Sequence, residues 1–189
     1  MDADYSIELG ADDPVLDFPW IDPSGKLAFF DLKRHPDSIV QIGEVQAFPE
    51  LGEFLRILNS PRSLLETAKC DAWATTELSP EEEIYNASNK FASYVDVVFS
   101  ETDARLGLPR HELFVKKLVE LLRRAPEIPS SAEACVRRCF FDNNRVVQEG
   151  FYVTLYTTGD GDDEAHARQN WGVGLKLVGN AAVQASLAR

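Results

Sequence analysis

The C-terminal third of the chain constrains the fold most strongly, because two strand-like runs lead directly into a long helix-like run. Residues 134–141 contain no Gly or Pro, and residues 151–158 are almost entirely aromatic, β-branched or Thr. Both compositions favour strands. The turn-forming residues 142–144 lie between the two runs, so the sequence predicts an antiparallel hairpin.

The helix after this hairpin is predicted from about Asp163 to Leu187, with Gly159 ending the second strand. Carboxylates at its start can cap free N–H groups and interact favourably with the helix dipole. Apolar residues at helical spacing predict one buried face. Gly172 and Gly179 share another face, where close packing is the expected reason for glycine. The apolar residues are Trp171, Leu175, Val178 and Ala182.

The same order of elements recurs earlier in the chain, with strands expected over 67–78 and 90–100 and a helix over 110–124. Sequence identity between the two stretches is low, so the repetition is one of structure. We therefore predict an α+β fold in which an antiparallel sheet of four to five strands carries helices on one face. The two strand–strand–helix units span residues 67–124 and 132–189.

Residues 1–47 are predicted to form an irregular acidic arm plus an edge strand over Lys26–Leu32. The arm contains apolar residues, including Phe18 and Trp20, so we expect it to pack on the body of the protein. A helix is predicted from Phe48–Pro49 to Asn59. The length of 189 residues is compatible with a single domain spanning 1–189.

Charge and composition narrow the classes of function. The net charge is −12, and residues 1–31 alone carry −7, so binding to nucleic acid is disfavoured. No apolar run is long enough to span a bilayer and no leader pattern is present, which predicts a cytoplasmic protein without membrane contact. Three cysteines are expected to be free thiols. No ligand spacing indicates a metal or another cofactor.

Strand alternation predicts one candidate binding surface, on the sheet face opposite the helices. Its central members are Asp71, Trp73, Tyr94, Asp96 and Tyr152, joined by Lys69, Thr154, Tyr156 and one of Arg137 and Arg138. Aromatic rings with a few convergent charges suit a small molecule or a protein partner. The alternative is that the arm covers this face and that its charges only neutralise one another.

No catalytic motif decides whether the protein is an enzyme. The acidic residues 160–164 and His166 are interpreted as a helix cap instead of a metal site. The first hypothesis is a non-enzymatic binding module that uses the aromatic sheet face. The second is a small-molecule enzyme with Asp71, Asp96 or His111 as acid or base, and with Ser79–Asn89 as a lid. The third is an inhibitor-type protein whose acidic arm binds a basic partner.

The C-terminal helix also predicts self-association. Its apolar and small side chains exceed those needed for one buried face, and such surfaces can pair closely. A homodimer through this helix is therefore a further hypothesis.

Overall fold

The computed structural model describes residues 1–22, 24–25, 28–76, 87–143 and 146–188. This part of the chain forms a six-stranded sheet in the order β1-β5-β6-β4-β3, with β2 also paired to β5. The strands are β1 (Asp2–Ile7), β2 (Leu16–Phe18), β3 (Leu65–Thr75), β4 (Asn89–Phe99), β5 (Ser130–Asn143) and β6 (Val146–Gly161).

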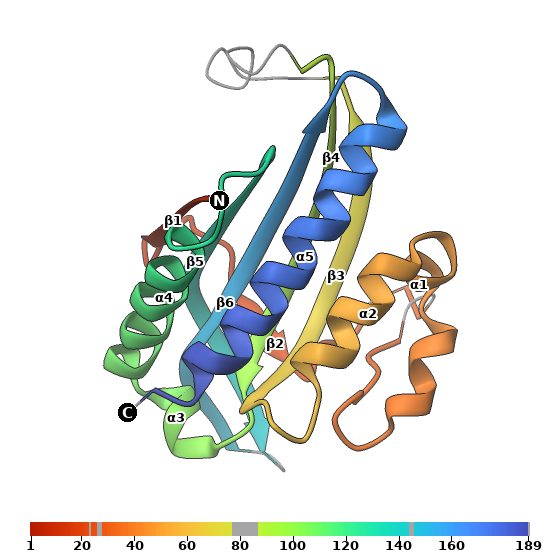
Figure 1. The fold of residues 1–189 in the computed structure, drawn as a ribbon. Coiled ribbons are helices and arrows are strands. Elements are labelled where there is room, and N and C mark those ends of the chain that lie inside the picture. Colours follow the sequence, from red (N-terminus) through yellow and green to blue (C-terminus); the bar gives the residue numbers. More distant parts are fainter. Residues whose placement is uncertain (23, 26–27, 77–86, 144–145, 189) are drawn as a thin grey trace.

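Helices cover one face of this sheet (Figure 1). α5 runs along β6 and β4, with α4 and α2 on either side of it. The helices are α1 (Gly43–Ala47), α2 (Pro49–Leu58), α3 (Thr102–Leu106), α4 (Leu108–Arg123) and α5 (Glu164–Ser186), with a 3-10 helix, η1 (Pro36–Gln41), before α1. The predicted α+β class and the three long predicted helices are confirmed.

The two predicted strand–strand–helix units are present. β3–β4 and β5–β6 are antiparallel hairpins, and the central pair β4–β6 is antiparallel as well. The alignment that matches Tyr94 with Tyr152 also matches Asp96 with Thr154, and these last two residues are cross-strand neighbours. In strand pairing the two hairpins are therefore related by an approximate two-fold axis at this pair, whereas α4 packs beside β1 and β5 and not over its own strand β4.

The sheet differs from the prediction in strand number and direction. It has six strands and is mixed, because β1 and β2 each pair with β5 in parallel. The edge strand predicted over Lys26–Leu32 is wrong for its described part, 28–32, which has no strand. The N-terminal arm instead extends the sheet at β5, a pairing between distant segments that leaves no local signal in the sequence.

Gly159 does not end β6, which continues to Gly161. A Cβ at Gly159 would lie 2.0 Å from the backbone nitrogen of Trp171, so glycine here permits α5 to approach the strand closely. The predicted helix start is confirmed, because the Asp163 side chain accepts a hydrogen bond from the backbone N–H of His166 at 2.8 Å.

The main core lies between the sheet and the helices. Trp171 of α5 is fully buried against Phe91 of β4, with ring centroids 4.6 Å apart, and its indole N–H donates to the Ser93 hydroxyl at 2.8 Å. A smaller cluster lies on the opposite face of the sheet, where the arm packs against β5 and β6. Its members are Leu16, Phe18, Val98, Cys139, Phe141 and Tyr152.

The glycines of α5 face its neighbours in the chain. A Cβ at Gly179 would lie 3.1 Å from the Phe54 ring of α2, and one at Gly172 would lie 3.3 Å from Glu50. Close packing is thus the reason for these glycines, as predicted. The same contacts occupy the surface that motivated the homodimer hypothesis, which therefore has no support from the arrangement of α5.

Candidate functional site

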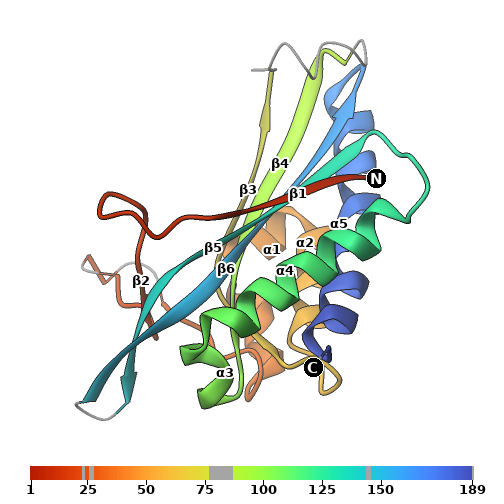
Figure 2. The same ribbon diagram turned by 90° about the vertical axis from the view of Figure 1, so that its left-hand side faces the viewer.

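The face of the sheet opposite the helices carries the predicted aromatic residues. Trp73 on β3, Tyr94 on β4 and Tyr156 on β6 form a row, with centroid distances of 6.4 Å between the first pair and 6.3 Å between the second. Trp73 is 40% exposed. Figure 2 shows the helices on one side of the sheet and the chain that follows β1 on the other. Strand alternation therefore assigned these three side chains to the correct face.

A chain of polar contacts runs beneath this row. Arg137 donates to the Glu8 carboxylate at 2.7 Å and to the Thr154 hydroxyl at 3.0 Å. Thr154 in turn donates to Asp96 at 2.7 Å. Of the two arginines considered from the sequence, Arg137 is the one that joins this face, and it also contacts the Tyr156 hydroxyl at 3.2 Å. Burial raises the pKa of Asp96 to about 6, against the opposing effect of the Thr154 hydrogen bond.

The five central residues predicted for the site do not all share one surface. Tyr152 is only 3% exposed because it belongs to the cluster that the arm covers. Asp71 is exposed, and its carboxylate accepts a hydrogen bond from the backbone N–H of Ala72 at 2.8 Å. Tyr94 lines a pocket together with Trp20 and Asp22 of the arm, and Asp96 is only 7% exposed. The arm thus buries the Tyr152 end of the predicted face and borders the aromatic row at Tyr94.

A β-bulge in β3 lies where the arm meets the aromatic row. The register with β4 shifts between Thr67 and Cys70, so one extra residue lies on β3. Regular strand alternation would put Ala68 on the same face as Cys70, and the bulge instead places it against the arm cluster. The indole N–H of Trp20 donates to the Ala68 carbonyl at 2.8 Å, and the Lys69 ammonium lies 5.5 Å from the Trp20 ring centroid.

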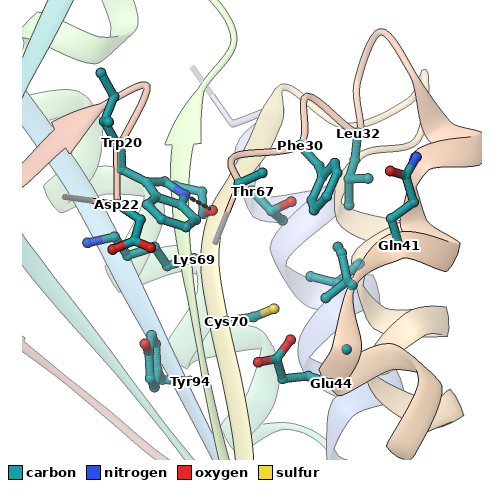
Figure 3. A pocket seen from close by; sticks show the side chains of 16 residues that line it. Trp20, Asp22, Phe30, Leu32, Gln41, Glu44, Thr67, Lys69, Cys70 and Tyr94 are labelled. Atoms are coloured by element: carbon teal, nitrogen blue, oxygen red, sulfur yellow. Dashed lines mark hydrogen bonds between the residues drawn. The ribbon is translucent and has the colours of Figure 1, made fainter. Parts of the chain in front are cut away.

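A pocket of about 480 Å³ lies beside this bulge, between β3, the arm and the segment that contains η1 and α1 (Figure 3). Trp20, Asp22 and Lys69 form one side, and Phe30 and Leu32 lie across from them. Tyr94, Cys70 and Glu44 lie at the base of the view. Tyr94 belongs both to the pocket lining and to the aromatic row.

Several residues of this pocket were not selected from the sequence. Phe30 and Leu32 were assigned to an edge strand, and Glu44 precedes α2 in a segment without a clear pattern. Among the apolar lining residues, Trp20 was expected to pack on the body. The pocket is formed by segments far apart in the chain, and the local hydrophobic period of a sequence carries no information about such tertiary contacts.

The thiol of Cys70 in the pocket is a weak nucleophile at neutral pH. Burial raises its pKa to about 12, and the negative charges of Glu44, Asp71 and Asp96 add to this effect. All three cysteines of the chain are free thiols. Among the described residues, no group of three or more His, Cys, Asp and Glu side chains is arranged to hold a metal ion.

The residues considered for acid–base chemistry lie on different faces. His111 is buried on the helix side of the sheet, with its ring 5.0 Å from Phe99 and 5.6 Å from Phe151. Burial lowers its pKa, so the ring is neutral at physiological pH. It shares no surface with Asp71 or Asp96. Most of the proposed lid over Ser79–Asn89 lies outside the described residues.

A second hollow of about 460 Å³ lies near α3, at the far end of the arm cluster. Charged residues line it, and they pair with one another. Arg105 donates to Glu66 at 3.1 Å, and its guanidinium lies 5.2 Å from the ring centroids of both Phe18 and Phe141. These contacts attach the arm to the body, so we assign this hollow a structural role.

No helix within the described ranges is long and apolar enough to cross a membrane. Comparison with protein-family models, with curated proteins and with solved structures found no match.

Proposed function

We propose that this protein is a non-enzymatic binding module for a small amphipathic molecule, held in the pocket beside β3. The observation that supports this most directly is the 480 Å³ pocket itself, which combines an apolar wall with a few charged side chains. Sites for small molecules typically have a volume of several hundred Å³, a mainly apolar lining and few polar groups. An apolar body would contact Phe30 and Leu32, while Glu44 and Lys69 would fix its orientation.

Blocking the pocket tests this proposal. Gly43 lines the pocket, and a Cβ added there would meet no heavy atom within 4 Å. Gly43→Leu should therefore fill part of the pocket without disturbing the core. We expect fragments found to bind the wild type in a ligand-observed NMR screen to lose about tenfold or more in affinity for Gly43→Leu. Gly43→Ala is the matched control and should retain them. A screen without hits, or hits unaffected by Gly43→Leu, would contradict the proposal.

An acid–base enzyme is the second candidate, and the pKa of Asp96 is the observation that favours it. A carboxyl group whose pKa is raised to about 6 can exchange protons near neutrality. However, Asp96 is 7% exposed and is not among the residues that line the pocket. Binding without catalysis therefore has the stronger support.

Protein partners are a weaker alternative. The aromatic row of Trp73, Tyr94 and Tyr156 would suit a protein contact. The inhibitor hypothesis required an acidic arm that protrudes, whereas β1 and β2 of the arm are strands of the sheet. Glu8 and Asp4 of the arm already pair with Arg137 and Arg123. A cytoplasmic location is supported by the free thiols and remains part of the proposal.

A further inference from the structure

We propose that the pocket selects cationic amphiphiles, meaning an amine or guanidinium group on an apolar body, and that Glu44 binds the cation. This inference rests on the binding function proposed above and specifies the chemistry of its ligand. The two parts can fail separately, because a pocket can bind small molecules without preferring a cation.

The position of Glu44 is the first argument. It lies in the first turn of α1, half-buried, and its carboxylate points into the pocket towards Cys70 (Figure 3). Among the residues that the structure describes, no hydrogen bond or ion pair to this carboxylate is present. A carboxylate held beside apolar walls without a partner is better stabilised by a cation than by partial hydration.

The charges around the pocket point in the same direction. Burial raises the pKa of the Cys70 thiol most, and the negative charges of Glu44, Asp71 and Asp96 raise it further. The base of the pocket therefore lies within electrostatic range of three carboxylates. Lys69 is the cationic side chain among the described lining residues, and it lies on the opposite side, over the Trp20 ring and beside Asp22 (Figure 3). An anionic ligand would be repelled at the base.

The apolar lining residues indicate which chemistry the rest of the ligand, beyond its cation, must have. Phe30, Leu32 and Leu55 line the pocket together with Ile42, which lies two residues before Glu44 in sequence. A ligand whose cation contacts Glu44 would lay its body against these side chains, and removal of that apolar surface from water would supply much of its affinity. The volume of about 480 Å³ suits a body of one or two rings.

Three probes with the same apolar body test the charge preference. We would titrate 2-(1-naphthyl)ethylamine, 2-(1-naphthyl)ethanol and 1-naphthylacetate into the full chain by isothermal calorimetry at about pH 7, where the amine is protonated. We expect the amine to bind about tenfold more tightly than the alcohol, and the carboxylate to bind most weakly. Glu44→Gln should weaken the amine about tenfold and leave the alcohol unchanged.

The matched control is Glu53→Gln, which removes a carboxylate that is 60% exposed on α2 and lies outside the pocket lining. It should leave all three affinities unchanged. Equal affinity for the three probes, a preference for the carboxylate, or an unchanged amine affinity in Glu44→Gln would overturn the cation proposal while the binding function stands. Failure of all three probes to bind would overturn both.

Cys70 offers a second readout at the same site. We expect Glu44→Gln to increase the rate of Cys70 alkylation by iodoacetamide several-fold, because loss of the neighbouring carboxylate lowers the pKa of the thiol. Mass spectrometry of the Cys70 peptide follows the reaction, and an unchanged rate in Glu44→Gln would contradict the assigned position of the Glu44 carboxylate beside the thiol.

Discussion

The carboxyl group of Asp96 is buried in the face of the sheet opposite the helices, and this should make stability depend on pH. Burial raises its pKa in the folded protein from 3.8 to about 6. The folded state therefore holds this proton more tightly than the unfolded state, so the group's contribution to stability falls as pH rises through this interval. Asp96→Asn removes the ionisation and keeps an acceptor for the Thr154 hydroxyl.

We expect Asp96→Asn to match the wild type at about pH 4 and to be more stable by up to ~3 kcal/mol above about pH 7. Urea unfolding of both proteins across this range measures the difference. Asp71→Asn removes an exposed carboxylate from the same face and should change stability little at any pH. A wild type that gains stability relative to Asp96→Asn as pH rises would contradict the assignment.

At the scale of the element, two of the three glycines of α5, Gly172 and Gly174, have different surroundings. A Cβ at Gly174 would lie 2.1 Å from the Ser130 hydroxyl oxygen and 3.2 Å from Thr157 of the sheet. A Cβ at Gly172 would lie 3.3 Å from Glu50, a flexible side chain that can move. Alanine favours a helix over glycine by about 1 kcal/mol at either position, so the difference between the two variants isolates the steric term.

We expect Gly174→Ala to lower the free energy of unfolding by about 1–3 kcal/mol, because the Ser130 hydroxyl would have to leave its hydrogen bond to the Thr158 carbonyl to make room for the new methyl group. Gly172→Ala should be neutral or stabilising by up to about 1 kcal/mol. Thermal unfolding of the two variants beside the wild type measures both effects. Similar changes in both proteins would show that contact with the sheet at Gly174 does not limit the approach of α5.

Some elements of the fold can be predicted from the local sequence pattern, and others cannot. The two hairpins and the helices α2, α4 and α5 were predicted because period and turn chemistry are local properties. Trp73, Tyr94 and Asp96 were assigned to the correct face for the same reason. The bulge at Ala68 and the parallel pairing of β1 and β2 were missed, since each depends on a neighbour far away in sequence.

The same limit applies to the candidate site. Alternation selected Tyr152 together with Tyr94, but it carries no information about what covers a face, and the arm buries Tyr152. The pocket joins three segments through tertiary contacts, so Glu44 could not be selected from its neighbours in sequence. Its carboxylate becomes notable only once the apolar walls around it are known.

At the scale of the whole molecule, the arm determines whether the chain unfolds as one cooperative unit. Phe18 anchors the arm: its ring lies 5.2 Å from Phe29 and 5.9 Å from Phe141, and it is 7% exposed. If the arm and the body form the single domain predicted from the sequence, Phe18→Ala should lower the global free energy of unfolding by about 3–5 kcal/mol. Ile21→Ala, on the same arm but 84% exposed, should have little effect.

Labelling of Cys139 separates this outcome from local opening of the arm. Cys139 is fully buried beneath the arm, so a thiol reagent reaches it only when that cover is lost. In a single cooperative unit, Phe18→Ala should lower the midpoint of thermal unfolding and accelerate labelling by the factor that corresponds to the loss of global stability. Faster labelling with an unchanged midpoint would instead show that the arm opens independently of the sheet, contradicting the single unit and making one wall of the pocket movable.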